Sequence, residues 1–141
     1  MIGENDMSNY EEQVISLLKK GKYRFEREKR FADLRHGMYR FDFYISVPGG
    51  RAIVEVNGEQ HYRFIPKFYS SRAEFEKAKE RDRRKISYCL ANNIPLYIIP
   101  YWELDNLTCA ADLFQPRFRA TSRWKNDQVM TDKIVFSIKS P

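Results

Sequence analysis

Three short strand-like segments follow one another near the start of the chain, and they constrain the fold more than any other feature. Short turn sequences separate them, namely His36-Gly37 and Pro48-Gly49-Gly50. Consecutive strands joined by such turns pair as antiparallel neighbours. The pattern predicts a three-stranded antiparallel meander formed by residues 23–31, 38–47 and 51–57.

A helix is predicted before the meander. Ser8 and Glu11 have the spacing of a capping box, with Ser8 as the N-cap. Apolar residues then recur at helical spacing, at Tyr10, Val14, Leu17 and Leu18. Lys19, Lys20 and Gly21 are typical of a helix end, so we expect the helix to stop there.

The rest of the chain predicts a second helix and a further strand. Ser71 and Glu74 form another capping box, and the helix should run to about Asn92. The apolar segment 95–101 predicts a short strand inside the sheet. A last helix over 102–111 and a terminal strand over 133–138 are also expected.

This order of elements predicts an α/β fold in which helices flank a small mixed sheet. A chain of 141 residues is long enough to bury the core of one domain. Its two cysteines form no disulfide framework, and no segment has the composition of a signal peptide or membrane span. We therefore expect a cytoplasmic protein with no membrane partner.

Positive charge is concentrated in three segments that also contain aromatic residues. The net charge is +6, and the basic clusters lie at 22–30, 79–85 and 117–125. Such clusters are typical of proteins that bind a phosphate backbone, although solvated helix faces have the same composition. Charge alone therefore favours nucleic acid only slightly.

Strand alternation places two acidic residues on one face of the predicted sheet. Phe41, Phe43 and Ile45 should share one face of the second strand, which leaves Asp42 on the other. In the third strand Glu55 falls opposite Val54 and Val56. Neighbouring carboxylates would make an oxygen site for Mg²⁺ or Mn²⁺, but a solvated sheet face would look the same.

The second helix also carries charged residues where apolar ones are expected. Asp82 lies in the stripe formed by Phe75, Ala78, Ile86 and Cys89, with Lys85 beside it. An acidic residue on an apolar stripe indicates a partner or a function, and a salt bridge to a nearby arginine is the alternative. Two interpretations of Glu11 remain open, as the last residue of the capping box or as part of the same site. His61 likewise either belongs to the site or is an inert loop residue.

Five ordered segments resemble the PD-(D/E)XK nuclease superfamily, which has an αβββαβ core. The resemblance is to the branch related to very-short-patch repair endonucleases and phage EDxHD homing endonucleases. It covers roughly residues 8–108 through "SNYE", "RFDFYI", "IVEVNGEQHY", "RDRRKISYC" and "NNIPLYIIPYWE". One position departs from the family pattern, because Asn57 stands where the family has an aspartate.

The resemblance implies a nuclease core at 1–108, a basic C-terminal extension at 109–141 packed on the same domain, and a metal-dependent endonuclease acting on DNA. Asp42 and Glu55 would hold Mg²⁺ or Mn²⁺, and His61 would serve as general base. The expected catalytic residues are Glu11, Asp42, Glu55, His61, Asp82 and Lys85. The expected DNA-binding residues are Arg40, Arg81, Arg84, Arg117, Arg119, Arg123 and Lys125. The alternative is a catalytically inactive nuclease fold that binds nucleic acid or a protein. Whether the chain forms a homodimer is left open.

Overall fold

The centre of the fold is a mixed β-sheet. The structure, a computed structural model, describes residues 4–62, 65–66 and 68–121. Within that part of the chain the sheet has four strands in the order β1-β2-β3-β4. Their bounds are β1 Phe25–Arg30, β2 Arg40–Val47, β3 Gly50–Asn57 and β4 Leu96–Pro100. The first three pair antiparallel and β4 runs parallel to β3, which confirms the meander and the α/β class.

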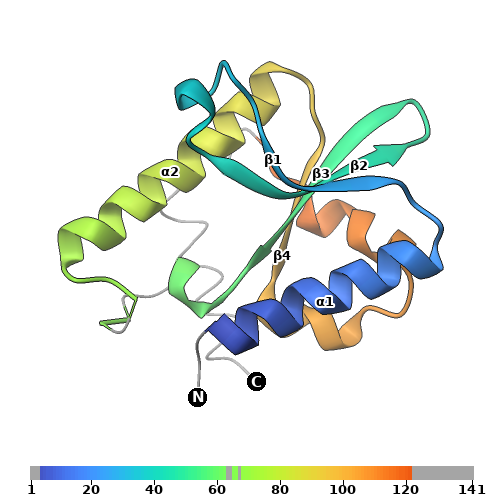
Figure 1. Ribbon diagram of the computed structural model, residues 1–141, viewed down its shortest axis with the longest axis horizontal. Coiled ribbons are helices and arrows are strands. Elements are labelled where there is room, and N and C mark those ends of the chain that lie inside the picture. Colours follow the sequence, from blue (N-terminus) through green and yellow to red (C-terminus); the bar gives the residue numbers. More distant parts are fainter. Residues whose placement is uncertain (1–3, 63–64, 67, 122–141) are drawn as a thin grey trace.

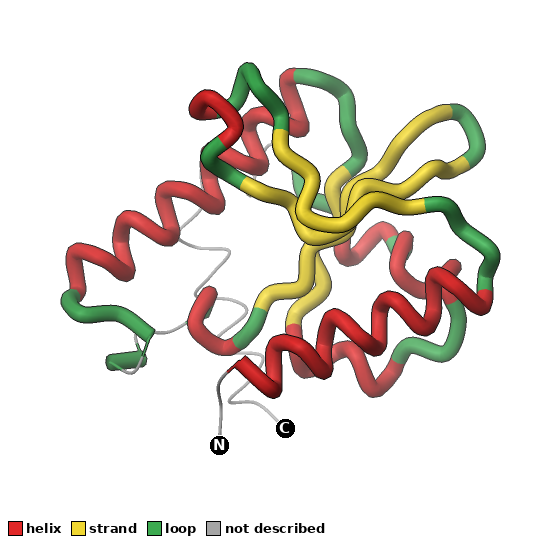
Figure 2. Tube along the Cα trace, in the orientation of Figure 1, coloured by secondary structure: helices red, strands yellow, loops and turns green. Residues whose placement is uncertain are grey.

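The two long helices cover opposite faces of the sheet (Figures 1 and 2). One is α1, Glu4–Lys20, whose Val14 and Leu18 pack with Phe43 of β2. The other is α2, Arg72–Ala91, whose Ile86 and Cys89 pack in a separate apolar cluster. Each helix therefore buries its own apolar core against the sheet.

The helix caps agree with prediction in one case only. The amide of Glu74 donates a hydrogen bond to Oγ of Ser71 at 3.2 Å, which confirms the start of α2. Ser8 was expected to cap α1, but that helix begins four residues earlier, at Glu4. Glu11 therefore lies on the body of α1 and is not part of its cap.

The segment after α2 differs from prediction in two respects. β4 was expected inside the sheet, yet among the strands described it lies at the edge and pairs with β3 alone. Backbone from the next segment covers its outer side, because Tyr97 bridges to Arg119 and the Ala120 amide donates to the Leu96 carbonyl at 2.8 Å. The expected last helix is instead a series of 3-10 turns at Tyr101–Asn106, Ala110–Phe114 and Pro116–Phe118.

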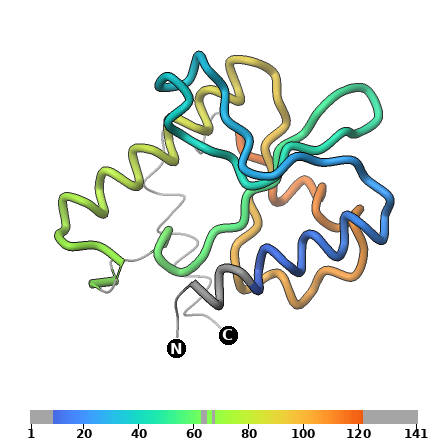
Figure 3. Tube along the Cα trace, in the orientation of Figure 1, coloured from blue at the N-terminus to red at the C-terminus, as the bar shows by residue number. Residues whose placement is uncertain are grey.

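These turns lie beside α1 although they are far from it in sequence (Figure 3). Leu104, Leu113 and Phe118 from this segment are buried in the same cluster as Val14 and Leu18. The predicted strand at 133–138 falls outside the described residues. None of the described helices is long and apolar enough to cross a membrane.

Candidate active site

A cleft of about 740 Å³ is lined by α1, β2, β3, the turn after β3 and α2. Because α1 and α2 cover opposite faces of the sheet, the cleft receives side chains from both layers of the fold. The lining includes all six residues expected to be catalytic: Glu11, Asp42, Glu55, His61, Asp82 and Lys85. The structure therefore brings together side chains that are up to 74 residues apart in the sequence.

Asp42 and Glu55 lie where β2 and β3 stop pairing through their backbones. The regular register between the strands ends at Phe43 and Val54. Beyond it the Asp42 amide donates to Oε2 of Glu55 at 2.9 Å, and the Val56 amide donates to Oδ2 of Asp42 at 2.9 Å. Each carboxylate thus accepts a hydrogen bond from the backbone of the opposite strand, which fixes the two acids side by side.

The same break changes the face on which Phe41 packs. Phe43 and Ile45 contact the α1 cluster, whereas Phe41 packs with Ile53 in the α2 cluster. The prediction that the three share one face is therefore wrong at Phe41. β1 contributes to the change, because Glu28 has φ +55° and is skipped in the register, as in a β-bulge.

The acidic pair is compensated by one buried lysine. Nζ of Lys85 forms an ion pair with Oε1 of Glu55, and each of these side chains is 11% exposed. Burial, reinforced by the charge of Glu55, raises the pKa of Asp42 to about 8. Although burial opposes its charge, the neighbouring carboxylates, with Glu55 foremost, raise the pKa of Lys85. Lys85 therefore stays cationic, whereas without a bound cation Asp42 is largely protonated at neutral pH.

His61 and Asp82 form a second polar pair in the cleft. Nδ1 of His61 lies 3.0 Å from Oδ2 of Asp82. Burial opposes both charged forms, yet the attraction between the two side chains dominates. It raises the pKa of His61 and lowers the pKa of Asp82. Because Nδ1 faces Asp82, the other ring nitrogen of His61 is available to a ligand.

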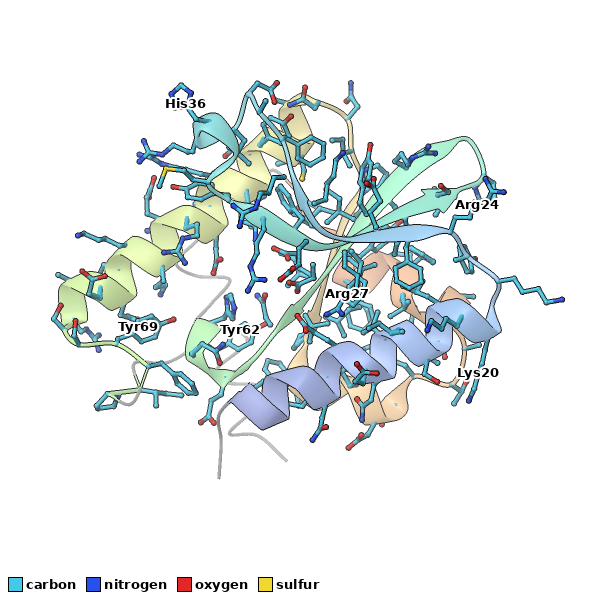
Figure 4. All side chains as sticks on the ribbon, viewed as in Figure 1. Lys20, Arg24, Arg27, His36, Tyr62 and Tyr69 are labelled. Atoms are coloured by element: carbon cyan, nitrogen blue, oxygen red, sulfur yellow. The ribbon has the colours of Figure 1, made fainter. Side chains whose placement is uncertain are left out.

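The turn that carries His61 is held from two sides. Tyr62 is buried, and its ring packs against Trp102 with centroids 5.1 Å apart. The hydroxyl of Tyr69 donates to the carbonyl of Gln60 at 3.0 Å. Figure 4 shows Tyr62 at this turn and Tyr69 beside the N-terminal end of α2. These contacts keep His61 at a fixed place beside α2.

Arg27 and Arg30 are site residues that the sequence placed in the basic cluster 22–30 but did not single out. Arg27 of β1 donates to Oε2 of Glu11 at 2.9 Å and points toward α1 in Figure 4. Arg30 lines the cleft and donates to the carbonyls of Gly37 and Met38 at 2.8 and 3.0 Å. Their position on β1, next to the strand carrying Asp42, is a signal that could have identified them.

The arginines expected to bind DNA occupy three different places. Arg40 and Arg81 line the cleft, and Arg40 also pairs with Glu28. Arg84 pairs with Glu80 on a neighbouring face of α2. Two others do not line the cleft: Arg117 bonds to Glu103 at 2.8 Å, and Arg119 stacks over Tyr97. Arg123 and Lys125 fall outside the described residues.

Two carboxylates and one amide oxygen are the cleft groups that could hold a hard divalent cation, mainly through water. Among the described residues, no group of three or more His, Cys, Asp or Glu side chains could enclose a metal ion. Mg²⁺ commonly binds proteins through one or two carboxylates and keeps several waters. Asp42 and Glu55 supply two such groups, and burial together with the charge of Glu55 raises the pKa of Asp42. Asn57 also lines the cleft and offers a neutral amide oxygen.

Replacing Lys85 by methionine should destabilise the protein by about 3–5 kcal/mol, because it leaves the buried side chain of Glu55 without its cationic partner. Urea denaturation in EDTA would measure this change in the free energy of unfolding. Lys77→Met is the matched control, since Lys77 lies on the same helix with a side chain that is 73% exposed. That control should cost less than about 1 kcal/mol.

A double variant tests the cause of this loss. Glu55→Gln combined with Lys85→Met removes both charges, so it should be more stable than Lys85→Met alone. If Lys85→Met unfolds at the same urea concentration as Lys77→Met, the buried ion pair does not stabilise the cleft.

Comparisons with known proteins give one relative without an assigned activity. No family model matches the chain, and no solved structure matches it. The chain is similar to "Uncharacterized protein 307L" of Invertebrate iridescent virus 6, with 32% identity over 82 residues. The match covers 58% of this chain and 42% of the viral protein, so the chain spans less than half of that relative. The chain is therefore similar to part of a viral protein, and this similarity does not assign the chain to a family.

Proposed function

We propose that this chain is a divalent-metal-dependent endonuclease that hydrolyses DNA phosphodiester bonds on a PD-(D/E)XK-like core. The observation that carries the proposal is the composition of the cleft. Asp42 and Glu55 lie side by side, Lys85 is paired with Glu55, and the His61–Asp82 pair faces the same space. Paired carboxylates, a lysine and a histidine base are the groups that metal-assisted phosphodiester hydrolysis requires.

The arrangement of elements supports the same proposal. The antiparallel meander, the α2 crossover and the parallel β4 follow the αβββαβ order of that superfamily. The acids lie on the second and third strands of the meander, and Lys85 comes from the crossover helix. The resemblance seen in the sequence and the placement of these side chains therefore point to one reaction.

A bound divalent cation would polarise the scissile phosphate and lower the pKa of a water molecule. Asp42 and Glu55 are the residues that would hold it. His61 accepts the proton of the attacking water at the ring nitrogen that does not face Asp82. Asp82 orients the imidazole and stabilises its protonated form.

The cationic side chains would act on the phosphate. Lys85 stays protonated, because its pKa is raised, and it stabilises the charge that develops on the phosphate oxygens. Arg81 and Arg40 line the same cleft and would contact neighbouring phosphates of the backbone. Glu11 is held by Arg27 and contributes a further carboxylate to the cleft.

A nuclease fold that binds nucleic acid or protein without hydrolysis is the second candidate function. Asn57 replaces the carboxylate found in the family at this position and faces the cleft. Both carboxylate oxygens of Glu55 also have partners, Lys85 and the Asp42 amide. These observations favour a module in which the acids maintain the structure.

Incubation with supercoiled plasmid and with a branched DNA junction should separate the two candidates. We expect cleavage in Mg²⁺ or Mn²⁺ and none in EDTA, because the acids require a cation to act on a phosphate. Asp105→Ala, at an exposed position away from the cleft, is the matched control for an identically purified Asp42→Ala protein. DNA binding without cleavage in either metal would favour the binding module.

A further inference from the structure

A second hollow lies beside the cleft, between α2 and the turn that follows β1. It has a volume of about 480 Å³. Its charged lining consists of Arg35 on the turn and Glu80, Arg83 and Arg84 on α2. The residues of α2 that line the cleft, Arg81 and Lys85 among them, lie on the adjacent face of the same helix.

Positive charge exceeds negative charge in this hollow. Arg83 and Arg84 share the single carboxylate of Glu80, at 3.6 and 3.3 Å. The guanidinium of Arg35 makes no hydrogen bond or ion pair with any described residue. Three guanidinium groups against one carboxylate make a site for an anionic ligand, and arginine is well suited to phosphate.

The turn holds Arg35 in a fixed position. Arg35 and His36 both have left-handed backbones, with φ +48° and +53°, a conformation that side chains rarely adopt. Arg30 bonds the carbonyls of Gly37 and Met38 from one side of the turn. From the other side, the Tyr88 hydroxyl of α2 donates to Oδ1 of Asp33 at 2.6 Å. The turn is therefore tied both to β1 and to α2.

The hollow and the cleft each share one lining residue with a third depression, which is also lined by Asp33. This depression of about 450 Å³ follows the turn, and it shares Met38 with the cleft and Arg35 with the α2 hollow. Met38 is 67% exposed, which is unusual for a large apolar side chain. An apolar group beside cationic ones suits the sugar and phosphate of a nucleic-acid strand.

We infer that the DNA backbone continues from the cleft across Met38 and into the α2 hollow, where Arg35, Arg83 and Arg84 bind its phosphates. The inference rests on the proposed function for the identity of the ligand. It extends that function, because productive binding then requires that the DNA duplex continue beyond the cleft, along α2, on one side of the cleaved bond. The substrate is thus recognised over a longer stretch than the cleft spans.

The test measures how DNA affinity depends on salt. Each phosphate contact contributes about 0.9 to the slope of log affinity against log salt. The variant Arg35→Gln/Arg83→Gln/Arg84→Gln should therefore reduce the slope by about 2–3 on a long duplex in EDTA. On a duplex too short to extend beyond the cleft, this variant and the wild type should give equal slopes.

The matched control removes the same charge elsewhere. Lys19→Gln/Lys20→Gln/Arg24→Gln changes three exposed residues, and Figure 4 shows Lys20 and Arg24 far from His36 and its turn. We expect the slope of this control to change by less than about 1.

The outcomes separate the two proposals. An unchanged slope for the arginine variant, or an equal loss in the control, overturns the α2 path, while wild-type cleavage of the plasmid still supports the nuclease. If the wild type binds DNA without cleaving it, and only the arginine variant has a reduced salt slope, the α2 path is supported and the nuclease is rejected. A wild type that does not bind DNA overturns both.

Discussion

Replacing Asp42 by alanine is expected to reduce the single-turnover cleavage rate about a thousandfold or more, because the cleft loses one of the two carboxylates proposed to hold the metal. DNA binding should persist, since the arginines proposed to contact phosphates are unchanged. Asp42→Asn should have the same effect on the rate and should retain the oxygen that accepts the Val56 amide. Quench-flow or gel assays with excess enzyme would measure the rates.

The charge of Asp42 also predicts how stability depends on pH. Its pKa is raised from 3.8 to about 8, so the folded protein disfavours the charged form. The metal-free wild type should therefore lose stability as the pH rises from about 4 to 8. Asp42→Asn lacks that charge, so in EDTA it should gain stability relative to the wild type over the same range. Asp105→Ala is the control, and near-wild-type cleavage by Asp42→Ala would reject the metal site.

Replacing His61 by alanine should slow cleavage by roughly two to four orders of magnitude, the usual contribution of a general base. Mg²⁺ affinity should change little, because oxygen ligands are preferred by this ion. The wild-type rate should fall as the pH drops through the His61 pKa, which Asp82 raises above its ordinary value of 6.5. Single-turnover rates and Mg²⁺ titrations of both proteins would test these expectations.

Asp82→Asn separates orientation from proton transfer. Loss of the Asp82 charge should lower the His61 pKa and so extend activity to lower pH, while the misoriented ring reduces the maximal rate. His61→Gln should be as slow as His61→Ala, because an amide does not accept the proton. An unchanged rate in His61→Ala would show that this histidine is not the base. A loss of Mg²⁺ affinity as well would make it a ligand.

Local signals in the sequence were sufficient to predict most of the secondary structure. The turn at Pro48-Gly49-Gly50 set the β2–β3 pairing, and the Ser71 cap set the start of α2. The same reasoning failed at Ser8, because a cap signal does not stop a helix when the preceding residues also favour one. It failed at 101–118 because turns packed on α1 depend on contacts distant in sequence.

The candidate site was predictable where it depended on periodicity and not where it depended on tertiary contacts. Alternation and helical spacing were enough to select Asp42, Glu55, Asp82 and Lys85 as residues of one region. Alternation could not place Phe41, because side-chain carboxylates interrupt the strand pairing beside it. Nor could it pair Arg27 with Glu11, which meet only when α1 packs across β1.

The reciprocal bonds of Asp42 and Glu55 have an evolutionary consequence. In most sheets the amides between neighbouring strands are satisfied by carbonyl oxygens, but here two of them depend on acidic side chains. If the proposed function holds, a descendant that no longer cut DNA would still face selection to retain an acceptor oxygen at both positions, since losing either one leaves a backbone amide unsatisfied. We therefore expect oxygen-bearing side chains at positions 42 and 55 to be retained longer than His61 in any lineage that keeps this fold and loses the proposed activity.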